Sequence, residues 1–303
     1  MIVTILKRKS LLAGVALFCL SSTASADANS LTDYFGPREI SLGETMRADS
    51  HGSLATTLNP AGLALNRQLV FEGSYGFRPG DSASTVAVSA CDSTVAVPGC
   101  FYYHYFGAEP ALEGMDYDRR VHEGGIAAAR AITSRLYFGV NARYFDYESN
   151  LAGEADSSGF AADFGATLKA TSHVQLAAVG YNLLAADSAQ YPMGVGAGIT
   201  VRPVAPLAIG LDGLWNLDVP EDASTGRYGA GLEYFMQSSD RLSGYPIRAG
   251  VVHDRELEAT YATAGLGYAS TKVGLDVGAR KQVDGGDELM VQAGLRVFGP
   301  HFP

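Results

Sequence analysis

A few histidine, serine and acidic residues stand at spacings that catalysis or metal binding would use. His51-Gly52-Ser53 has the separation at which a histidine could activate a serine in a barrel-borne lipid hydrolase, but it lies outside any predicted strand. His253-Asp254 could serve an acidic protease, yet it is a lone adjacent pair. Glu113, Asp116 and Asp118 could hold Ca²⁺, but no glycine-centred loop accompanies them. We therefore predict no enzyme, no catalytic residue, no metal and no cofactor.

Cys91 and Cys100 are the two cysteines that remain once a signal sequence is removed, and they flank a predicted turn. An exported chain with two thiols nine residues apart can oxidise them to a disulfide. A metal or redox site would need a further histidine or cysteine nearby, and the sequence has none there. We predict a structural disulfide, with free thiols as the alternative.

Charged residues of both signs recur on one parity of alternating segments, where they would share a face with glycines. Buried charges persist only when they are paired or hydrated, so this mixture favours a wet interior over a dedicated ion site. The predicted interior charges are Arg143, Asp163, Lys169, Asp212, Glu233, Arg248, Asp276, Arg280 and Arg296.

The elements that must position these charges are β-strands. In Leu136–Glu148 and Gly159–Ala170, apolar and polar or small residues alternate strictly. Alternation over about ten residues indicates a strand with two different faces, and strands of that length suit a transmembrane β-barrel. A soluble lipocalin-like barrel is the alternative, and it would carry its apolar face inside. The apolar parity of the two segments comprises Phe138, Val140, Ala142, Tyr144, Phe160, Ala162, Phe164, Ala166 and Leu168.

About fourteen such strands follow Gln68, an even number that returns the chain to the end of the barrel where it began. We therefore predict an all-β fold, an antiparallel transmembrane barrel of about 14 strands. The predicted strands are Leu69–Phe77, Thr85–Cys91, Phe101–Phe106, His122–Ile132, Leu136–Glu148, Gly159–Ala170, Val174–Leu184, Met193–Arg202, Leu207–Leu217, Arg227–Met236, Ile247–His253, Thr260–Ala269, Lys272–Gln282 and Leu289–Phe298.

The connections alternate between long acidic loops and short turns. Gly107–Arg120 and Ser149–Ser158 are long, whereas Thr133–Arg135 and Thr171–His173 are short; Gln237–Tyr245 is an enlarged turn in the short set. Outer-membrane barrels keep long loops outside and short turns in the periplasm, so both termini should face the periplasm. Aromatic residues near strand ends, among them Tyr144 to Tyr147, are expected at the headgroup level.

Met1–Ala26 has the features of a secretory signal. Lys7-Arg8-Lys9 form its basic start, and Leu11–Leu20 form an apolar core too short to span a bilayer as a helix. Ala24-Ser25-Ala26 predicts cleavage before Asp27. We expect a location in the outer membrane of a Gram-negative bacterium, with membrane lipid and lipopolysaccharide as partners.

A lipoprotein is a weaker alternative, because Cys19 follows the bulky Phe18. Loss of the three signal cations leaves 19 cationic residues against 32 acids, a net charge of −13, which argues against a nucleic-acid partner. The predicted parts are the signal 1–26, an amino-terminal segment 27–68, and the barrel 69–303.

The amino-terminal segment Asp27–Gln68 is predicted to fold into the barrel as a plug, with the Asn59-Pro60 turn deep inside. Glycines on an inward face either relieve crowding at bends or leave space for another segment, and this is the segment available. The predicted inward glycines are Gly139, Gly165, Gly196, Gly198, Gly229, Gly231, Gly265, Gly267 and Gly294.

Residues 41–66 also resemble a known family. Gly43 to Ala48, then Ser53–Thr57, then Asn59-Pro60-Ala61-Gly62-Leu63, are similar to the amino-terminal hatch of FadL-type long-chain fatty-acid transporters and of the related PorV-type barrels. The resemblance implies a small domain that plugs a fourteen-stranded barrel, with Asn59, Pro60, Ala61, Gly62 and Leu63 as hatch or gate residues. Thr57-Leu58 departs from the pattern, in which an aromatic residue often precedes Asn-Pro-Ala.

Two functional classes remain open. The protein could be a porin-like, passive channel for small hydrophobic molecules with the hatch as its gate, as in the FadL-type relatives. Alternatively, it could be a docking barrel of an envelope or secretion machine, as in the PorV-type relatives. Other envelope proteins would then bind Gln237–Tyr245 or Gly107–Arg120.

Overall fold

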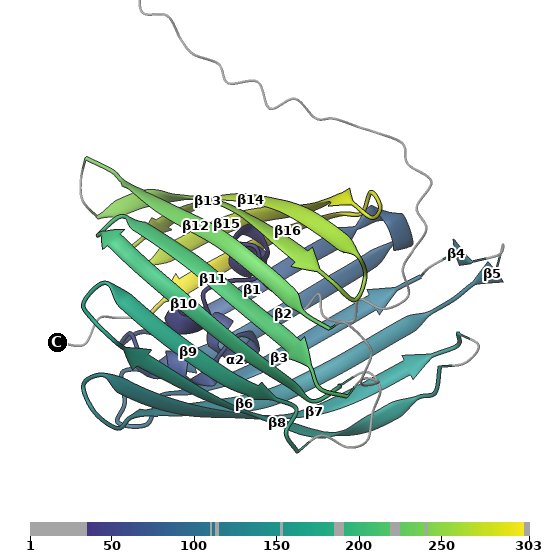
Figure 1. The fold of residues 1–303 in the computed structure, drawn as a ribbon, viewed down its shortest axis with the longest axis horizontal. Helices are drawn as coiled ribbons and strands as arrows, with labels where there is room; N and C mark the ends of the chain where they lie inside the picture. The colour runs from purple at the N-terminus through teal and green to yellow at the C-terminus, as the bar shows by residue number, and fades with distance from the viewer. Residues whose placement is uncertain are drawn as a thin grey trace, which may run out of the picture.

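Fourteen antiparallel strands close into one barrel in the computed structural model (Figure 1). The structure describes residues 35–109, 111–112, 115–151, 154–184, 191–218, 225–239 and 242–299. The predicted signal Met1–Ala26, with Cys19, and Glu113 lie outside the described residues. The barrel strands are β1 (Leu69–Arg78), β2 (Ala83–Asp92), β3 (Gly99–Ala108), β6 (Arg119–Ala131), β7 (Leu136–Ser149), β8 (Ser157–Lys169), β9 (Val174–Tyr181), β10 (Gly194–Val204), β11 (Leu207–Asn216), β12 (Arg227–Gln237), β13 (Ser243–Asp254), β14 (Ala259–Ser270), β15 (Val273–Asp284) and β16 (Leu289–Phe298).

Each strand pairs with its neighbour along the chain, and β1 closes the barrel on β16. That last ladder runs from Val70 opposite Phe298 to Phe77 opposite Val291. Closure leaves no strand edge, so backbone N–H and C=O groups find partners within the wall, as hydrocarbon surroundings require. Between β3 and β6 a small ribbon, β4 (Ala111–Leu112) with β5 (Met115–Asp116), lies apart from the barrel.

Apolar side chains point outward from the barrel and polar ones inward, as the alternation predicted. Phe138, Val140 and Phe164 are each about half exposed, whereas Asn141 and Asp163 are buried. A lipocalin-like barrel would have the reverse arrangement, so that alternative is wrong. An exposed apolar face of this extent needs a hydrocarbon solvent, which identifies the strands as transmembrane.

The enlarged turn predicted at Gln237–Tyr245 is wrong in its extent. β12 continues to Gln237 and β13 begins at Ser243, so only residues 238–242 connect them. Pro246 suggests a break, but it stays opposite Phe235 in the ladder with β12. Only the ladder from β13 to β14 is interrupted there, since proline donates no N–H.

The two ends of the barrel differ. We call the end with connections 79–82, 109–118, 150–156, 182–193, 217–226, 255–258 and 285–288 the long-loop end. The opposite end, with connections 93–98, 132–135, 170–173, 205–206, 238–242 and 271–272, is the short-turn end. Connection 79–82, at the long-loop end, is short and contains the 3₁₀ turn η3 (Pro79–Asp81).

Residues 35–68, which we call the hatch segment, lie inside the barrel, where Figure 1 shows their purple coils enclosed by the strands. The segment forms α1 (Pro37–Ser41), η1 (Arg47–Asp49), α2 (Leu54–Thr57) and η2 (Pro60–Ala64). α1 contacts β13 to β16, η1 contacts β9 and β10, and η2 contacts β6 to β8, so the hatch segment crosses the interior. In the described part of the chain, no helix combines the length and apolarity needed to cross a membrane.

Candidate functional site: the barrel interior and its hatch

Glycines on the inner wall make room for the hatch segment. A Cβ atom built on Gly231 would lie 2.0 Å from the carbonyl oxygen of Leu42, and one on Gly139 would lie 2.3 Å from the carbonyl carbon of Pro60. No real Cβ fits at such distances, so the backbone of the hatch segment contacts the wall directly. Of the nine predicted inward glycines, Gly139, Gly229 and Gly231 face the hatch backbone in this way. Five others would meet hatch side chains, and Gly267 faces Asp276 and Pro246 instead.

The predicted hatch residues Asn59 to Leu63 are buried against β7 and β8. The Asn59 side chain donates to the Arg47 carbonyl oxygen at 2.9 Å and to Thr167 Oγ1 at 2.8 Å, and it accepts from the Ala61 N–H at 3.1 Å. The bond from the Ala61 N–H caps η2, and the bond to Thr167 attaches η2 to β8. Pro60, Ala61, Gly62 and Leu63 form the η2 turn that follows, and all four are buried.

One network of ion pairs joins the hatch segment to the wall near the long-loop end. Glu44, in the hatch segment, accepts from Arg227 of β12 and from Arg280 of β15, at 2.5 and 3.1 Å. Arg227 also contacts Asp254 at 2.9 Å, and Arg280 also contacts Glu288 at 2.8 Å. A single hatch carboxylate thus pairs with two arginines, and each arginine pairs with one further acid of the wall.

A second network lies around α1. Arg38 of the hatch segment donates to both carboxylate oxygens of Glu233, at 3.1 and 3.2 Å. The chain of pairs continues along the wall through Arg248 to Asp276 and Arg296, with distances of 2.7 Å from Arg248 to Glu233, 2.5 Å from Arg248 to Asp276 and 2.6 Å from Arg296 to Asp276. Four of the predicted interior charges, Glu233, Arg248, Asp276 and Arg296, thus meet in one place.

Two further buried ion pairs include three more of the predicted interior charges, Asp212, Arg143 and Asp163. Arg47 Nη1, in the hatch segment, lies 3.0 Å from Asp212 of β11. Arg143 of β7 binds Asp163 of β8. Lys169 is the exception among the predicted charges, because its ammonium lies 4.8 Å from the centre of the Tyr137 ring and is partly exposed. Direct pairing, and not hydration alone, thus accounts for most of the interior charge.

Among the hatch groups whose pKa values are shifted, Glu39 lies in α1 and His51 lies beside it. Burial and the neighbouring Arg38 guanidinium lower the pKa of His51 to about 4. Its Nε2 lies 3.2 Å from Arg38 Nη1 and its Nδ1 lies 3.0 Å from the Asp49 carbonyl oxygen. Burial also raises the pKa of Glu39, which accepts from Thr57 Oγ1 at 3.1 Å.

A cavity separates the hatch segment from one side of the wall. It encloses about 520 Å³, counting its opening to solvent, between α1 and α2 on one side and β1, β2 and β16 on the other. Glu39 and Thr57 line it from the hatch segment, and Glu72, Ser89 and Arg296 line it from the wall. The interior is therefore not completely filled beside α1.

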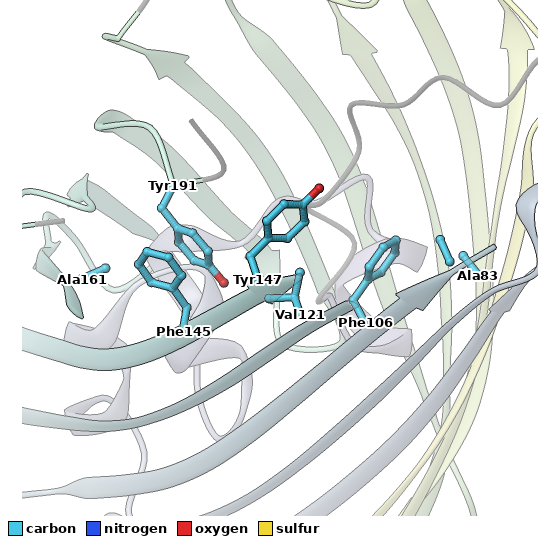
Figure 2. Packing of buried hydrophobic residues seen from close by; sticks show 8 residues of the cluster. Ala83, Phe106, Val121, Phe145, Tyr147, Ala161 and Tyr191 are labelled. Carbon is cyan, nitrogen blue, oxygen red and sulfur yellow. The ribbon is translucent and has the colours of Figure 1, made fainter. Parts of the chain in front are cut away.

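An apolar cluster on the inner wall was not predicted from the sequence. It lies near the long-loop end, and Figure 2 shows the rings of Phe145, Tyr147, Tyr191 and Phe106 turned into the barrel. Phe145 and Tyr147 were expected at the lipid headgroups, which is wrong: both share the inward parity of Arg143 and are fully buried. Their odd positions, shared with Arg143, could have predicted from the sequence that both rings point into the barrel. The aromatic cluster comprises Ala83, Phe106, Ala108, Val121, Phe145, Tyr147, Ala161 and Tyr191.

The residues considered for catalysis do not come together. Both ring nitrogens of His51 face groups other than Ser53, and the Ser53 N–H binds Glu72. His253 is exposed on the outside of β13, bonded to Thr260, whereas Asp254 points inward to Arg227.

The three acids considered for Ca²⁺ do not form a described site. Asp118 pairs with Arg120, and the side chains of Glu113 and Asp116 are outside the described residues.

Cys91 and Cys100 are opposite one another at the short-turn end of β2 and β3, with their sulfur atoms bonded at 2.01 Å. They pack with Leu63 of η2 in a buried cluster. The disulfide therefore lies where the hatch segment joins the wall.

A closed barrel of fourteen antiparallel strands with an amino-terminal hatch across its interior defines a class of outer-membrane barrel fold. No family model matches the sequence, and no curated protein matches it. Solved structures do match the fold. The chain is similar to the CymD monoaromatic hydrocarbon channel (TM-score 0.71, 15% identity, 90% of this chain and 100% of that chain covered).

The chain is also similar to the Ralstonia pickettii toluene transporter TbuX (TM-score 0.67, 14% identity, 90% of this chain and 100% of that one covered). A Pseudomonas aeruginosa FadL homologue matches as well (TM-score 0.57, 10% identity, 87% and 96% covered). This chain has the fold of a FadL-type outer-membrane barrel.

Proposed function

We propose that the protein is a passive channel for small hydrophobic molecules in the bacterial outer membrane, with the hatch segment as its gate. The observation that carries the proposal is the aromatic cluster, an apolar patch on an inner wall that is otherwise charged. The names of the similar structures, a toluene transporter and a monoaromatic hydrocarbon channel, agree with this class of cargo.

The aromatic cluster gives a hydrophobic molecule a place to leave water. Phe106, Val121 and Phe145 face the interior from three adjacent strands near the long-loop end. Transfer of a small ring from water onto such a surface gains about 25 cal/mol per Å² of apolar area that is buried. A wall of ion pairs alone would offer no such gain, because charged groups lose hydration when an apolar molecule approaches.

The hatch segment supports gating because separable ion pairs form part of its attachment to the wall. Glu44, Arg38 and Arg47 bind wall residues on β11, β12 and β15. Of these wall residues, Arg227, Arg280 and Glu233 each have a second charged partner within the wall. The wall charges would thus remain partly paired if the hatch segment moved. Displacement of the hatch segment would break these polar pairs and also the apolar contacts that Leu42, Met46 and Leu63 make with the wall.

The placement in the membrane belongs to the same proposal. We infer that the signal is cleaved near Ala26, that the long-loop end faces outward, and that membrane lipid and lipopolysaccharide surround the barrel. The docking alternative is not carried further, because the similar structures are named as channels or transporters and because one of its two suspected surfaces, the turn at Gln237–Tyr245, contains only residues 238–242. No other feature of the described residues favours it.

A reversible lock on the hatch segment tests the proposal. The Cβ atom of Thr45 lies 3.1 Å from the position of a Cβ on Gly210 of β11, close to the separation of about 3.5–4.5 Å in disulfides. We expect the double variant Thr45→Cys with Gly210→Cys to hold the hatch segment to β11 when oxidised. Initial uptake of labelled toluene by cells without another hydrophobic-compound channel should fall to the empty-vector rate and recover with reductant.

Matched controls separate the lock from other effects. Each single cysteine variant should transport toluene under oxidising conditions, and the reductant should leave wild-type uptake unchanged. Wild-type uptake no faster than that of the empty vector would overturn the channel. Undiminished uptake by the fully cross-linked protein would overturn the gate.

A further inference from the structure

Tyr191 differs from the other members of the aromatic cluster in its origin. The others lie on strands, whereas Tyr191 comes from the connection between β9 and β10 and inserts its ring into the cluster (Figure 2). Its ring stacks on Phe145 with the ring centres 3.9 Å apart and an angle of 20° between the planes. The side chain is almost completely buried.

The polar end of Tyr191 meets a buried acid. Its hydroxyl donates to Glu123 Oε2 of β6 at 3.0 Å. Glu123 Oε1 lies 3.3 Å from His104 Nδ1, so the carboxylate is held in place from a second strand. A buried carboxylate requires such partners, which makes a hydroxyl donor at this position energetically significant.

Arg143 completes the surroundings of the ring. Its guanidinium carbon lies 5.8 Å from the centre of the Tyr191 ring, at the distance of a cation–π contact. Arg143 is more than nine-tenths buried, and its Nε makes no hydrogen bond with the described residues. This nitrogen lies 3.4 Å from Glu123 Oε2, with which it forms an ion pair. Arg143 and the Tyr191 hydroxyl therefore approach the same carboxylate oxygen of Glu123.

We propose that Tyr191 occupies a binding site for phenols and acts as its internal ligand. The site offers an aromatic face on Phe145, a guanidinium over the ring and a carboxylate that accepts from the hydroxyl. These three contacts fit a ligand that has one aromatic ring with a hydroxyl substituent. A phenol that enters from the long-loop end displaces the Tyr191 side chain and takes over its three contacts. The site therefore selects phenols over the corresponding hydrocarbons.

The selectivity for phenols over hydrocarbons depends on the Glu123 carboxylate, which accepts a hydrogen bond from a hydroxyl. Toluene fills the apolar part of the site but leaves the Glu123 oxygen without the donor that Tyr191 supplies. A site built around such a hydrogen bond rejects the analogue that lacks it far more strongly than an apolar pocket distinguishes sizes. The inference deepens the proposed channel function by naming a cargo class, and it rests on that function for its biological meaning only.

Binding to the purified full-length protein in detergent tests the site. In Tyr191→Ala the internal ligand is absent, and 4-methylphenol, which has the substituents of the tyrosine ring, should bind at least about tenfold more tightly than toluene by calorimetry. It should also bind more tightly to Tyr191→Ala than to wild type, where it must displace the side chain. The affinity of Tyr191→Phe for 4-methylphenol should lie between those of Tyr191→Ala and wild type, because this variant keeps the ring without the hydroxyl.

Two further variants locate the effect. Tyr144→Ala removes the neighbouring ring of β7, which is exposed on the outside of the barrel, and should bind 4-methylphenol as wild type does. Glu123→Gln in the Tyr191→Ala background should reduce the preference over toluene to about twofold or less, because a neutral acceptor forms the weaker hydrogen bond.

The outcomes separate this site from the channel. Equal affinity of Tyr191→Ala for 4-methylphenol and toluene, or no binding of either, overturns the phenol site, and this comparison decides the question even if Glu123→Gln does not fold. Toluene uptake by the wild type, measured separately, tests the channel. A protein that transports toluene but shows no preference for 4-methylphenol would retain the proposed function and lose this inference.

Discussion

The Arg280 guanidinium of β15 donates to the Glu44 carboxylate of the hatch segment at 3.1 Å, although 236 residues separate the two in the chain. Both side chains are almost completely buried. Arg227 approaches the same carboxylate from β12. Glu44 thus attaches the hatch segment to both β12 and β15. A substitution of Glu44 is therefore the most direct way to weaken the attachment of the hatch segment.

Replacement of Glu44 by glutamine should weaken the attachment of the hatch segment. The variant leaves two buried guanidinium groups without their shared carboxylate, although Asp254 and Glu288 still contact them. We expect a loss of about 2–3 kcal/mol in the free energy of unfolding, below the usual cost of breaking a buried ion pair. Single-channel conductance in a planar bilayer should rise. Glu256→Gln changes an exposed acid at the same end and should alter neither quantity; equal conductance of Glu44→Gln and wild type would refute the assigned role of Glu44.

Gly231→Ala should displace the hatch segment from the wall. The added Cβ would lie 2.0 Å from the Leu42 carbonyl oxygen, so the backbone of the hatch segment must move. We expect destabilisation of about 1–3 kcal/mol, measured as the shift in thermal unfolding of the detergent-solubilised barrel. Gly124→Ala is the matched control, because its Cβ would meet nothing within 4 Å. It should be neutral or slightly stabilising, and comparable losses in both variants would contradict direct packing of the hatch segment on the wall.

Asn59→Asp should disrupt the turn that the sequence singled out. The substitution keeps the acceptor for the Ala61 N–H but removes the donors to the Arg47 carbonyl and to Thr167. A buried charge with the Ala61 N–H as its remaining backbone donor should cost about 2 kcal/mol or more, measured by denaturant unfolding. Asn150→Asp, in an exposed loop where only the acceptor is used, should unfold as wild type does. Identical stability of the two variants would remove Asn59 from its structural role.

The hatch segment should lose stability as the pH falls from about 6.5 to about 4. The pKa of His51 is lowered to about 4 in the folded protein, so between these values the unfolded chain binds more protons at this residue than the folded one. His51 therefore contributes stability that is present above its unfolded pKa and is lost in acid. Because the side chain is partly exposed, we expect this loss to be on the order of 1–2 kcal/mol.

His51→Gln isolates this effect. Glutamine does not titrate, and it can accept from Arg38 in place of the histidine ring nitrogen. The raised pKa of Glu39 acts in the opposite direction and is present in both proteins. The difference in unfolding free energy between wild type and His51→Gln should thus change steadily between pH 6.5 and 4. A constant difference over that range would exclude the titration of His51.

Several features of this protein could be read from local patterns. Phe138 and Asn141 differ in parity, and side chains of a strand alternate between its faces, so their positions outside and inside the barrel follow from spacing alone. The number of strands and the position of Asn59 at a buried turn follow from the same local rules, since turn residues and alternation act over only a few neighbours.

The partners of the interior charges required the tertiary structure. Arg38 pairs with Glu233 across 195 residues of sequence, and no local pattern selects that acid over others of the same parity. The approach of the hatch backbone to Gly231 likewise depends on how the segment crosses the closed barrel. The same is true of Tyr191, whose loop origin hides its place against Phe145 and Glu123. Alternation is a property of neighbouring residues, so the sequence determined the wall, whereas contacts inside the barrel join distant segments and were decided only by how the barrel closes.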